Sequence, residues 1–226
     1  MTKINKKLLH TVLNQKFEAI PDATVIETSS STFHGVDMSK SIRSVSKVLQ
    51  KYGIDTEEPI ACLLSPSAES VFSILGIWAA GGVYFPLDKQ LPDDLLKKYL
   101  EVVQPGKLII EPEHHERMQA ILNAAFPTKI FEFIQDQETG LIFVTEINSF
   151  GVGNELSNPD PEPDSGNYIL FTSGSTGIPK AIFGQHKSLS HFIHWEVNEF
   201  GLDSSERVSW LAPPMFDVSF RDILTP

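Results

Sequence analysis

The spacing of apolar residues in the first fifty positions predicts a helix, two short strands and a second helix. Apolar side chains fall on one helical face between residues 8 and 17, which predicts an amphipathic helix that ends at Pro21. Two short strands are expected next, at 23–27 and 31–34. A second helix follows, with Asp37 or Ser39 as its cap, and it ends at Gly53. We expect these elements to be scaffold.

Residues 59–87 show a denser pattern that indicates a parallel sheet. An apolar strand at 59–64 leads into a strongly apolar helix at 68–80, two glycines end that helix, and 83–87 is extended. Strand, helix and strand at this density are typical of a parallel sheet that is covered on both faces. The unit recurs, with helices expected at 92–103 and 113–126 and strands at 108–110 and 129–133. The fold class predicted is therefore α/β, with mostly parallel sheets flanked by helices.

The second half of the chain resumes this pattern after an interruption. A strand is expected at 141–145, and the segment 154–166, rich in proline and acidic residues, reads as a solvated connector. Beyond it we expect strands at 168–171, 181–184 and 208–211. A helix is expected at 186–199, capped near Ser188.

The composition and net charge of the chain argue against some classes of function. The chain has 226 residues, of which 41% are apolar and 21% charged, as in ordinary globular proteins. Its formal net charge of -11 argues against a nucleic-acid-binding surface, although ATP needs only local positive charge. The lone Cys62 lies in an apolar run, as a small buried hydrophobe would, and no apolar run approaches the roughly 20 residues of a membrane span. We expect a cytoplasmic protein that binds neither nucleic acid nor membrane.

The segment 168–180 carries the main candidate chemistry. An apolar strand runs directly into a loop of hydroxyls and glycines that ends in a lysine, a composition that suits a polyphosphate. The glycines allow close approach of the backbone, the hydroxyls donate to phosphate oxygens, and Lys180 adds charge. The spacing differs from that of the common P-loop, and a flexible surface loop is the simpler alternative. The candidate phosphate-binding residues are Thr172, Ser173, Gly174, Ser175, Thr176, Gly177 and Lys180.

The order of residues in this loop resembles a known family signature. The string TSGSTGIPK at 172–180 is similar to the phosphate loop of the adenylate-forming enzymes, which include acyl-CoA synthetases, luciferases and the adenylation domains of nonribosomal peptide synthetases. The segment IWAAGGVYFPLD at 77–88 also resembles the family. Two departures stand out: Ala181 replaces the glycine usual after the lysine, and Thr32–Asp37 matches the family's early motif poorly.

A second segment, Ala212–Phe220, places the carboxylate of Asp217 among apolar neighbours. Taken alone, Asp217 reads as a helix N-cap, a task that Ser219 can share. The segment resembles the Phe-Asp-x-Ser segment of peptide-synthetase adenylation domains, and this resemblance implies that Asp217 binds the α-ammonium group of an amino acid. It also places Phe216, Val218 and Arg221 among the substrate-binding residues.

Arg221 is an uncommon residue at its place in the family. It could pair with an acidic or polar side chain of the substrate. The alternative is a salt bridge to Asp222 or to a nearby helix, and the rest of the specificity pocket lies outside this chain.

Histidines cluster near the start of the helix expected at 186–199, but no third ligand stands at a recognised spacing. His191 and His194 are spaced i,i+3 and His186 precedes them, without an H-E-x-x-H motif. We expect no metal site built from protein ligands, and we interpret these histidines as polar or interfacial helix residues.

The resemblance implies a reaction and its partners. A carboxylate and ATP would give an aminoacyl adenylate and pyrophosphate, with Mg²⁺ and Lys180 neutralising charge, before the acyl group passes to a carrier-protein thiol. The implied partners are an amino-acid substrate, a carrier protein in the full-length enzyme and a small MbtH-like helper protein.

The resemblance covers residues 1–226 but only the N-terminal part of the family fold, an AMP-binding adenylation domain without its C-terminal domain. We therefore expect little adenylation activity from these residues alone, and self-association through truncated sheet edges. Pyrophosphate exchange by the isolated chain, above a Lys180→Ala control, would refute the first expectation. Two alternatives stay open: a fragment of an acyl- or aryl-CoA ligase or aminoadipate-reductase-like enzyme, and a noncatalytic nucleotide-binding module.

Overall fold

The structure is a computed structural model that describes residues 8–122, 129–135, 142–148, 160–172 and 179–226. Its centre is a seven-stranded sheet in the order β7-β6-β5-β3-β4-β8-β9, and a separate two-stranded sheet pairs β1 with β2. The five inner strands of the large sheet are parallel, whereas β7 and β9 pair antiparallel at its edges. The strands are β1 Thr24–Glu27, β2 Thr32–His34, β3 Pro59–Leu63, β4 Val83–Pro86, β5 Lys107–Ile110, β6 Lys129–Gln135, β7 Ile142–Asn148, β8 Gly166–Thr172 and β9 Lys180–Gln185.

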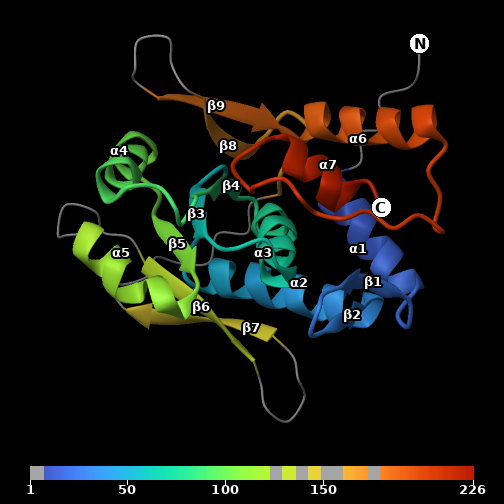
Figure 1. The fold of residues 1–226 in the computed structure, drawn as a ribbon, viewed down its shortest axis with the longest axis horizontal. Coiled ribbons are helices and arrows are strands. Elements are labelled where there is room, and N and C mark those ends of the chain that lie inside the picture. The colour runs from blue at the N-terminus through green and yellow to red at the C-terminus, as the bar shows by residue number, and fades with distance from the viewer. Residues whose placement is uncertain (1–7, 123–128, 136–141, 149–159, 173–178) are drawn as a thin grey trace.

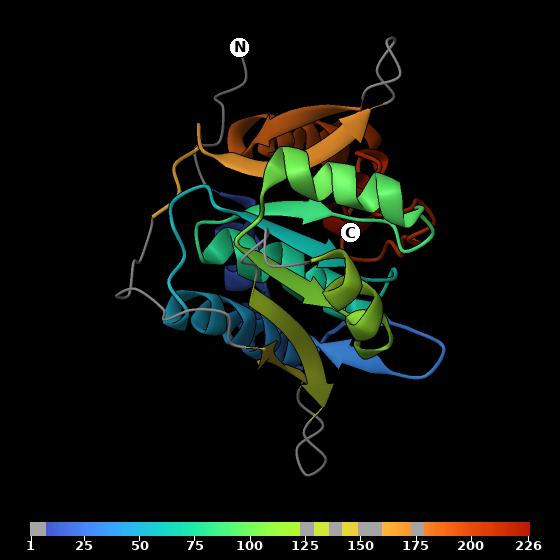
Figure 2. The ribbon, with the colours of Figure 1, turned by 90° about the vertical axis from the view of Figure 1, so that its left-hand side faces the viewer.

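Helices cover both faces of this sheet. One face carries α1 Leu9–Ala19, α2 Gly35–Lys51, α3 Ala68–Ala79, α6 His186–Phe200 and α7 Val218–Leu224. The opposite face, on the left of Figure 1 and toward the viewer in Figure 2, carries α4 Asp93–Val103 and α5 His115–Ile121, with the short 3₁₀ helix η1 Pro112–His114 before α5. This arrangement confirms the α/β class predicted from the sequence.

Strand β3 shows why the sheet needs cover on both faces. Ile60 and Cys62 belong to the core under α3, while Ala61 and Leu63 belong to the core under α4. Alternate side chains of a strand point to opposite faces, so a strand that is apolar at every position buries both. Burial raises the pKa of the Cys62 thiol, which keeps it in its neutral form.

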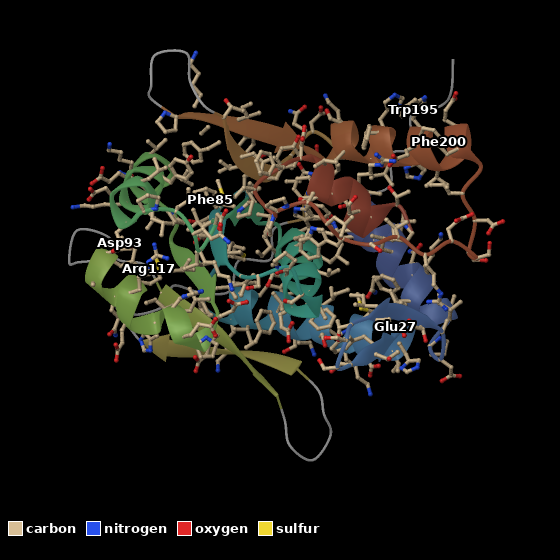
Figure 3. The ribbon with its side chains drawn as sticks, in the orientation of Figure 1. Glu27, Phe85, Asp93, Arg117, Trp195 and Phe200 are labelled. Atoms are coloured by element: carbon tan, nitrogen blue, oxygen red, sulfur yellow. The ribbon has the colours of Figure 1, made fainter. Side chains whose placement is uncertain are left out.

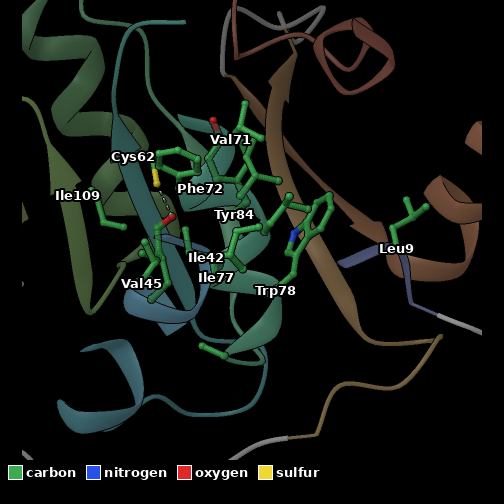
Figure 4. Close-up of a cluster of buried hydrophobic side chains, with 14 of the residues drawn as sticks. Leu9, Ile42, Val45, Cys62, Val71, Phe72, Ile77, Trp78, Tyr84 and Ile109 are labelled. Atoms are coloured by element: carbon green, nitrogen blue, oxygen red, sulfur yellow. Dashed lines mark hydrogen bonds between the residues drawn. The ribbon is translucent and has the colours of Figure 1, made fainter. Parts of the chain in front are cut away.

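The core under α3 is built around large aromatic side chains. Trp78, Phe72 and Tyr84 are fully buried there, in one cluster with Cys62 and Ile109 (Figure 4). The indole Nε1–H of Trp78 donates to the backbone oxygen of Asn167 at 2.5 Å, so α3 is fixed to β8 by a polar contact as well as by packing.

Two expected helix starts differ from the observed ones. Helix α2 begins at Gly35 with His34 as its N-cap, and Asp37 sits inside the first turn, where its carboxylate accepts from the His34 backbone N–H at 2.8 Å. Asp37 therefore stabilises the helix start as the N3 member of a capping box and is not itself the cap. Helix α6 starts at His186, so a cap near Ser188 was also wrong.

The strand expected at 208–211 is wrong. These residues lie in no strand, and Val208 and Leu211 are exposed. An extended apolar segment becomes a strand only where a neighbouring strand pairs with its backbone, and here Asp222 of α7 accepts the N–H groups of Leu211 and Ala212 instead.

Candidate functional site

The loop singled out by the sequence connects β8 to β9 as a hairpin. Thr172, the last residue of β8, pairs with Lys180, the first residue of β9, and both are exposed. The other predicted phosphate-binding residues, Ser173, Gly174, Ser175, Thr176 and Gly177, lie outside the described residues. The two described ends of the hairpin thus place a hydroxyl and an ammonium group at the carboxyl edge of the parallel strands.

Alternation along β8 fixes the face on which these two residues lie. Tyr168 and Leu170 pack with the core under α3, whereas Ile169 and Phe171 pack with the core under α4. By the same period Thr172 belongs to the face of Tyr168, and Lys180 shares it because residues directly opposite in an antiparallel pair lie on one face. That face carries α3, α6 and α7.

Helix α7 is held on this same face by one aromatic side chain. Phe220 is 1% exposed, and its ring centroid lies 4.8 Å from that of Tyr168 and 6.2 Å from those of Trp78 and Tyr84. Aromatic pairs at these separations add to the free energy gained from burial. The contact brings the N-terminal end of α7 beside β8.

Asp217 is the residue immediately before α7. Its side chain is exposed and forms no capping hydrogen bond. Ser219 does not cap either, because its hydroxyl donates to the backbone oxygen of Pro214 at 3.4 Å. Burial and, to a smaller degree, the carboxylate of Asp217 raise the pKa of Tyr168. Because Phe220, three residues further on, packs against Tyr168, Asp217 lies near β8, and its carboxylate accepts no hydrogen bond from the part of the chain that the structure describes.

The segment before α7 is tied down at both ends. The Asp222 Oδ2 atom accepts the backbone N–H groups of Leu211 at 3.1 Å and Ala212 at 3.2 Å, and the Trp210 indole N–H donates to the Ala212 oxygen at 2.6 Å. Met215 packs against the core under α4, although Phe220 lies in the core on the other face. The segment from Met215 to Phe220 thus passes from one face of the sheet to the other.

The other predicted pocket residues, which are near Asp217 in the sequence, differ in polarity and in their contacts. Phe216 and Val218 are exposed apolar side chains, 58% and 45% accessible. Arg221 forms an ion pair through its Nε atom with Glu196 of α6, and Thr225 donates to the other oxygen of that carboxylate at 2.8 Å. Of the two roles considered for Arg221, the salt bridge to a nearby helix is therefore present.

The described histidines of α6 differ in environment. His191 is exposed, while the Nδ1 atom of His194 lies 2.7 Å from the backbone oxygen of Ser190. His186 is buried between Trp78 and His10, with ring centroids 5.6 Å from each. The sequence spacing could not foresee this burial, because α1, which supplies His10, lies far away in the chain.

One group of potential metal ligands occurs among the described residues, at the end of β5. Ligand atoms of Glu111, Glu113 and His114 lie within 4.8 Å of one another. The Glu111 carboxylate, however, already accepts the backbone and side-chain donors of Ser65 at 2.8 and 3.2 Å, and Lys89 lies 3.8 Å away. These contacts join the loops after β3, β4 and β5, so we interpret the group as a structural tie. Arg117 adds a similar tie to Asp93 of α4 (Figure 3).

The described ends of the hairpin and the start of α7 carry charges of opposite sign. Lys180 supplies a positive charge and Thr172 a hydrogen-bond donor, and Asp217 supplies a negative charge near β8, where Phe220 packs against Tyr168.

Sequence reasoning missed the parts played by Tyr168 and Glu196. Asp222, considered as a salt-bridge partner of Arg221, instead accepts the backbone N–H groups of Leu211 and Ala212. The helical spacing could have predicted that Glu196 is buried, because this acid lies on the same inward face of α6 as Leu189 and Ile193.

Comparison with known proteins gives a family match over nearly the whole chain. The family model described as AMP-binding enzyme matches residues 13–226. Polyketide synthase PksN of Bacillus subtilis (strain 168) is 28% identical over 221 residues, which cover 97% of this chain and 4% of PksN. Bacitracin synthase 3 of Bacillus licheniformis is 23% identical over 220 residues, which cover 96% of this chain and 3% of that synthase. The chain thus spans less than a tenth of either relative.

Solved structures share the fold. The crystal structure of the nonribosomal peptide synthetase FmoA3 in its alpha-methyl-L-serine-AMP bound form has a TM-score of 0.82 at 21% identity, covering 99% of this chain and 23% of FmoA3. The AMPPNP bound form of FmoA3 gives a TM-score of 0.79 at the same identity, over 22% of that chain. Of the helices in the described residues, none has both the length and the apolar character that crossing a membrane requires.

Proposed function

This chain belongs to the AMP-binding enzyme family, and we propose that it forms the N-terminal part of an adenylation domain that activates an amino acid. The reaction would join a carboxylate to ATP, giving an aminoacyl adenylate and pyrophosphate, and the acyl group would then pass to a carrier-protein thiol. FmoA3, which shares the fold, binds AMPPNP and alpha-methyl-L-serine-AMP, ligands of the kind that this reaction requires.

One observation supports the proposal: Thr172 and Lys180 pair at the end of the hairpin on the face of β8 that Tyr168 shares, and Phe220, three residues after Asp217, packs against Tyr168 with 4.8 Å between ring centroids. An amino acid placed on that face would meet a carboxylate at its ammonium group and a cation near its reaction partner. An ammonium group withdrawn from water needs an opposite charge and hydrogen-bond acceptors. Asp217, whose carboxylate is exposed and makes no capping hydrogen bond, offers both.

In the proposed step, a carboxylate oxygen of the amino acid attacks the α-phosphorus of ATP, and the bond to the β-phosphate oxygen breaks. Negative charge then builds on the departing pyrophosphate, where Lys180 and the loop hydroxyls would stabilise it. Mg²⁺ bound to the phosphate oxygens would add further neutralisation. Most of the catalysis is therefore alignment and charge stabilisation, with Lys180 as the proposed catalytic cation.

The residues near Asp217 suggest how the side chain of the substrate would be recognised. We place Phe216, Val218 and Arg221 at this pocket as proposals, since each is at least partly exposed beside Asp217. A carrier protein and an MbtH-like helper remain proposed partners, and a cytoplasmic location remains the proposed compartment.

The test is amino-acid-dependent exchange of pyrophosphate into ATP by the complete gene product that contains these residues. A panel of amino acids and of carboxylic acids without an α-amino group should show exchange with at least one amino acid and none with its des-amino counterpart. Exchange with carboxylic acids alone would instead favour an acyl- or aryl-CoA ligase or an aminoadipate-reductase-like enzyme. ATP binding without exchange for any acid would favour a noncatalytic nucleotide-binding module.

A further inference from the structure

Glu196 is a buried carboxylate that faces α7 rather than solvent. It is the one acid among the buried residues of α6, a helix that the structure describes completely, and its side chain is 3% exposed. Its two oxygens contact the Nε atom of Arg221, which lies on α7, and the hydroxyl of Thr225, the C-cap of that helix. A carboxylate withdrawn from water needs such partners, so Glu196 holds Arg221 firmly.

A second acid, Asp217, stands at the N-cap position of the helix that carries Arg221. Asp217 precedes it by four residues, and the Asp217 backbone is helical, with φ -59° and ψ -28°. Asp and Arg at i and i+4 lie on one helical face and attract each other. Glu196 and Asp217 therefore compete for one guanidinium group, and in the structure this group forms its ion pair with Glu196.

Burial decides this competition in favour of Glu196. Its carboxylate is shielded from water and salt, whereas Asp217 is exposed and its attraction for Arg221 is screened. Were Arg221 to turn to Asp217, the guanidinium would cover the acceptor positions that an ammonium group needs.

We propose that Glu196 is a positioning residue that keeps Arg221 away from Asp217, so that Asp217 stays free for the α-ammonium group of the substrate. The second half of this statement rests on the proposed function of Asp217. The first half, that Glu196 keeps Arg221 away from Asp217, concerns the chain alone and can be tested without an activity assay.

The structural test compares crystal structures of the 226-residue chain as wild type and as the Glu196→Gln variant. Glutamine keeps the shape of glutamate and an acceptor for Thr225 while removing the negative charge. We expect the Arg221 guanidinium to turn from residue 196 to within hydrogen-bond distance of Asp217. An Arg221 that stays against the introduced glutamine, or points into solvent, would overturn the proposal.

The kinetic test uses the complete gene product and the amino acid that gives the fastest exchange, paired with its des-amino acid. Glu196→Gln should lower the discrimination between the two acids by about tenfold, the free-energy equivalent of one charge-assisted contact. In the Arg221→Gln background, which lacks the guanidinium group, the same Glu196→Gln change should alter the discrimination by less than about threefold. Thr225→Val, which removes only the hydroxyl contact to Glu196, is the matched control and should leave the ratio unchanged.

If Glu196→Gln lowers the discrimination as much in the Arg221→Gln background as in the wild type, Glu196 acts only through the packing of α7, and the proposal would be wrong. If the crystal structures behave as expected but wild type activates no amino acid, the proposed function fails. The competition between Glu196 and Asp217 for Arg221 would then still stand.

Discussion

At the scale of single residues, Asp217 carries most of the proposed specificity. It is exposed, makes no capping contact, and adds to the effect of burial in raising the pKa of Tyr168 on β8, the strand before the loop that is proposed to bind phosphate. Its charge is therefore free to select a cationic group in a substrate, while nearby Phe216 and Val218 offer apolar contact.

Replacing Asp217 with asparagine should weaken amino-acid recognition. The loss of one ionic hydrogen-bonding partner is worth about 1.5–3 kcal/mol, so we expect the KM for the amino acid to rise about 10- to 100-fold. The KM for ATP should change little, since the nucleotide is proposed to bind at the hairpin. Asp94→Asn, an exposed aspartate in the first turn of α4, is the matched control; an equal effect there would count against a role for Asp217.

Two buried histidines make stability depend on pH. Burial lowers the pKa of His186 to about 3, with a smaller contribution from neighbouring His10. Burial also lowers the pKa of His10 to about 4, partly offset by Asp160. In the unfolded chain both titrate near 6.5, so the unfolded state takes up protons first as the pH falls.

We predict a loss of roughly 2 kcal/mol for each of these histidines between pH 7 and pH 5. Urea unfolding at a series of pH values measures the free energy of unfolding directly. His186→Phe keeps an aromatic ring against Trp78 but does not titrate, so its stability should fall less steeply over this range. The exposed His191→Gln variant should retain the wild-type slope, and identical slopes for all three proteins would refute the assignment.

The assignment of Lys180 and Asp217 as site residues comes from the recognisable strings of neighbours around them and stays a prediction. The structure shows Lys180 paired with Thr172 across the hairpin and Asp217 at the start of α7. The partner of Arg221 could not be named, because Glu196 lies 25 positions earlier and meets it only when α6 and α7 pack together. The burial of His186 against His10 was hidden for the same reason.

At the scale of elements, α7 depends on packing for its existence. It has seven residues, far fewer than an isolated helix needs in water. Phe220 and Leu224 bury its apolar side, while Asp222, Arg221 and Thr225 attach its polar side to the preceding segment and to α6.

Phe220→Ala should therefore both destabilise the chain and displace Asp217. Removal of a fully buried phenylalanine costs about 3–5 kcal/mol, which urea unfolding would detect. Phe216→Ala removes the same atoms from an exposed position just before α7, and its cost should stay within about 0.5 kcal/mol. Comparable losses for the two variants would contradict the packing described for α7.

Element predictions succeeded where local pattern alone determines the outcome. Strands β3 and β4 and helix α3 were placed almost residue for residue, because continuous apolar runs bounded by turn residues admit few other structures. The segment 208–211 has the same apolar character but lacks a strand to pair with, and only the tertiary arrangement reveals that. The cap of α2 was misplaced because Asp37 stabilises a helix start equally well from the N3 position.

At the scale of the whole molecule, β9 leaves one edge of the large sheet unpaired in the described residues. Ile182 and Phe183 on this strand are exposed, and the next helix carries the exposed aromatic residues Trp195 and Phe200 (Figure 3). Unpaired apolar edges favour association between chains, although the net charge of -11 opposes it at low salt.

We predict that the chain self-associates as concentration and salt increase. Sedimentation velocity over a range of concentrations should show species larger than a monomer in wild type. Ile182→Lys should shift the distribution toward monomer, because a lysine on an edge strand blocks pairing. Val102→Lys on α4, also an exposed apolar position, is the control and should leave association unchanged. A monomer at every concentration in wild type would contradict this prediction.

The measurement that bears most directly on the account is a crystal structure of the complete gene product with AMPPNP and its best amino acid bound. We predict that the terminal phosphates lie at the hairpin between Thr172 and Lys180, and that the α-ammonium group lies within hydrogen-bond distance of Asp217, in one shared cleft. A structure in which the nucleotide binds away from this hairpin, or in which Asp217 faces away from both ligands, would contradict the account.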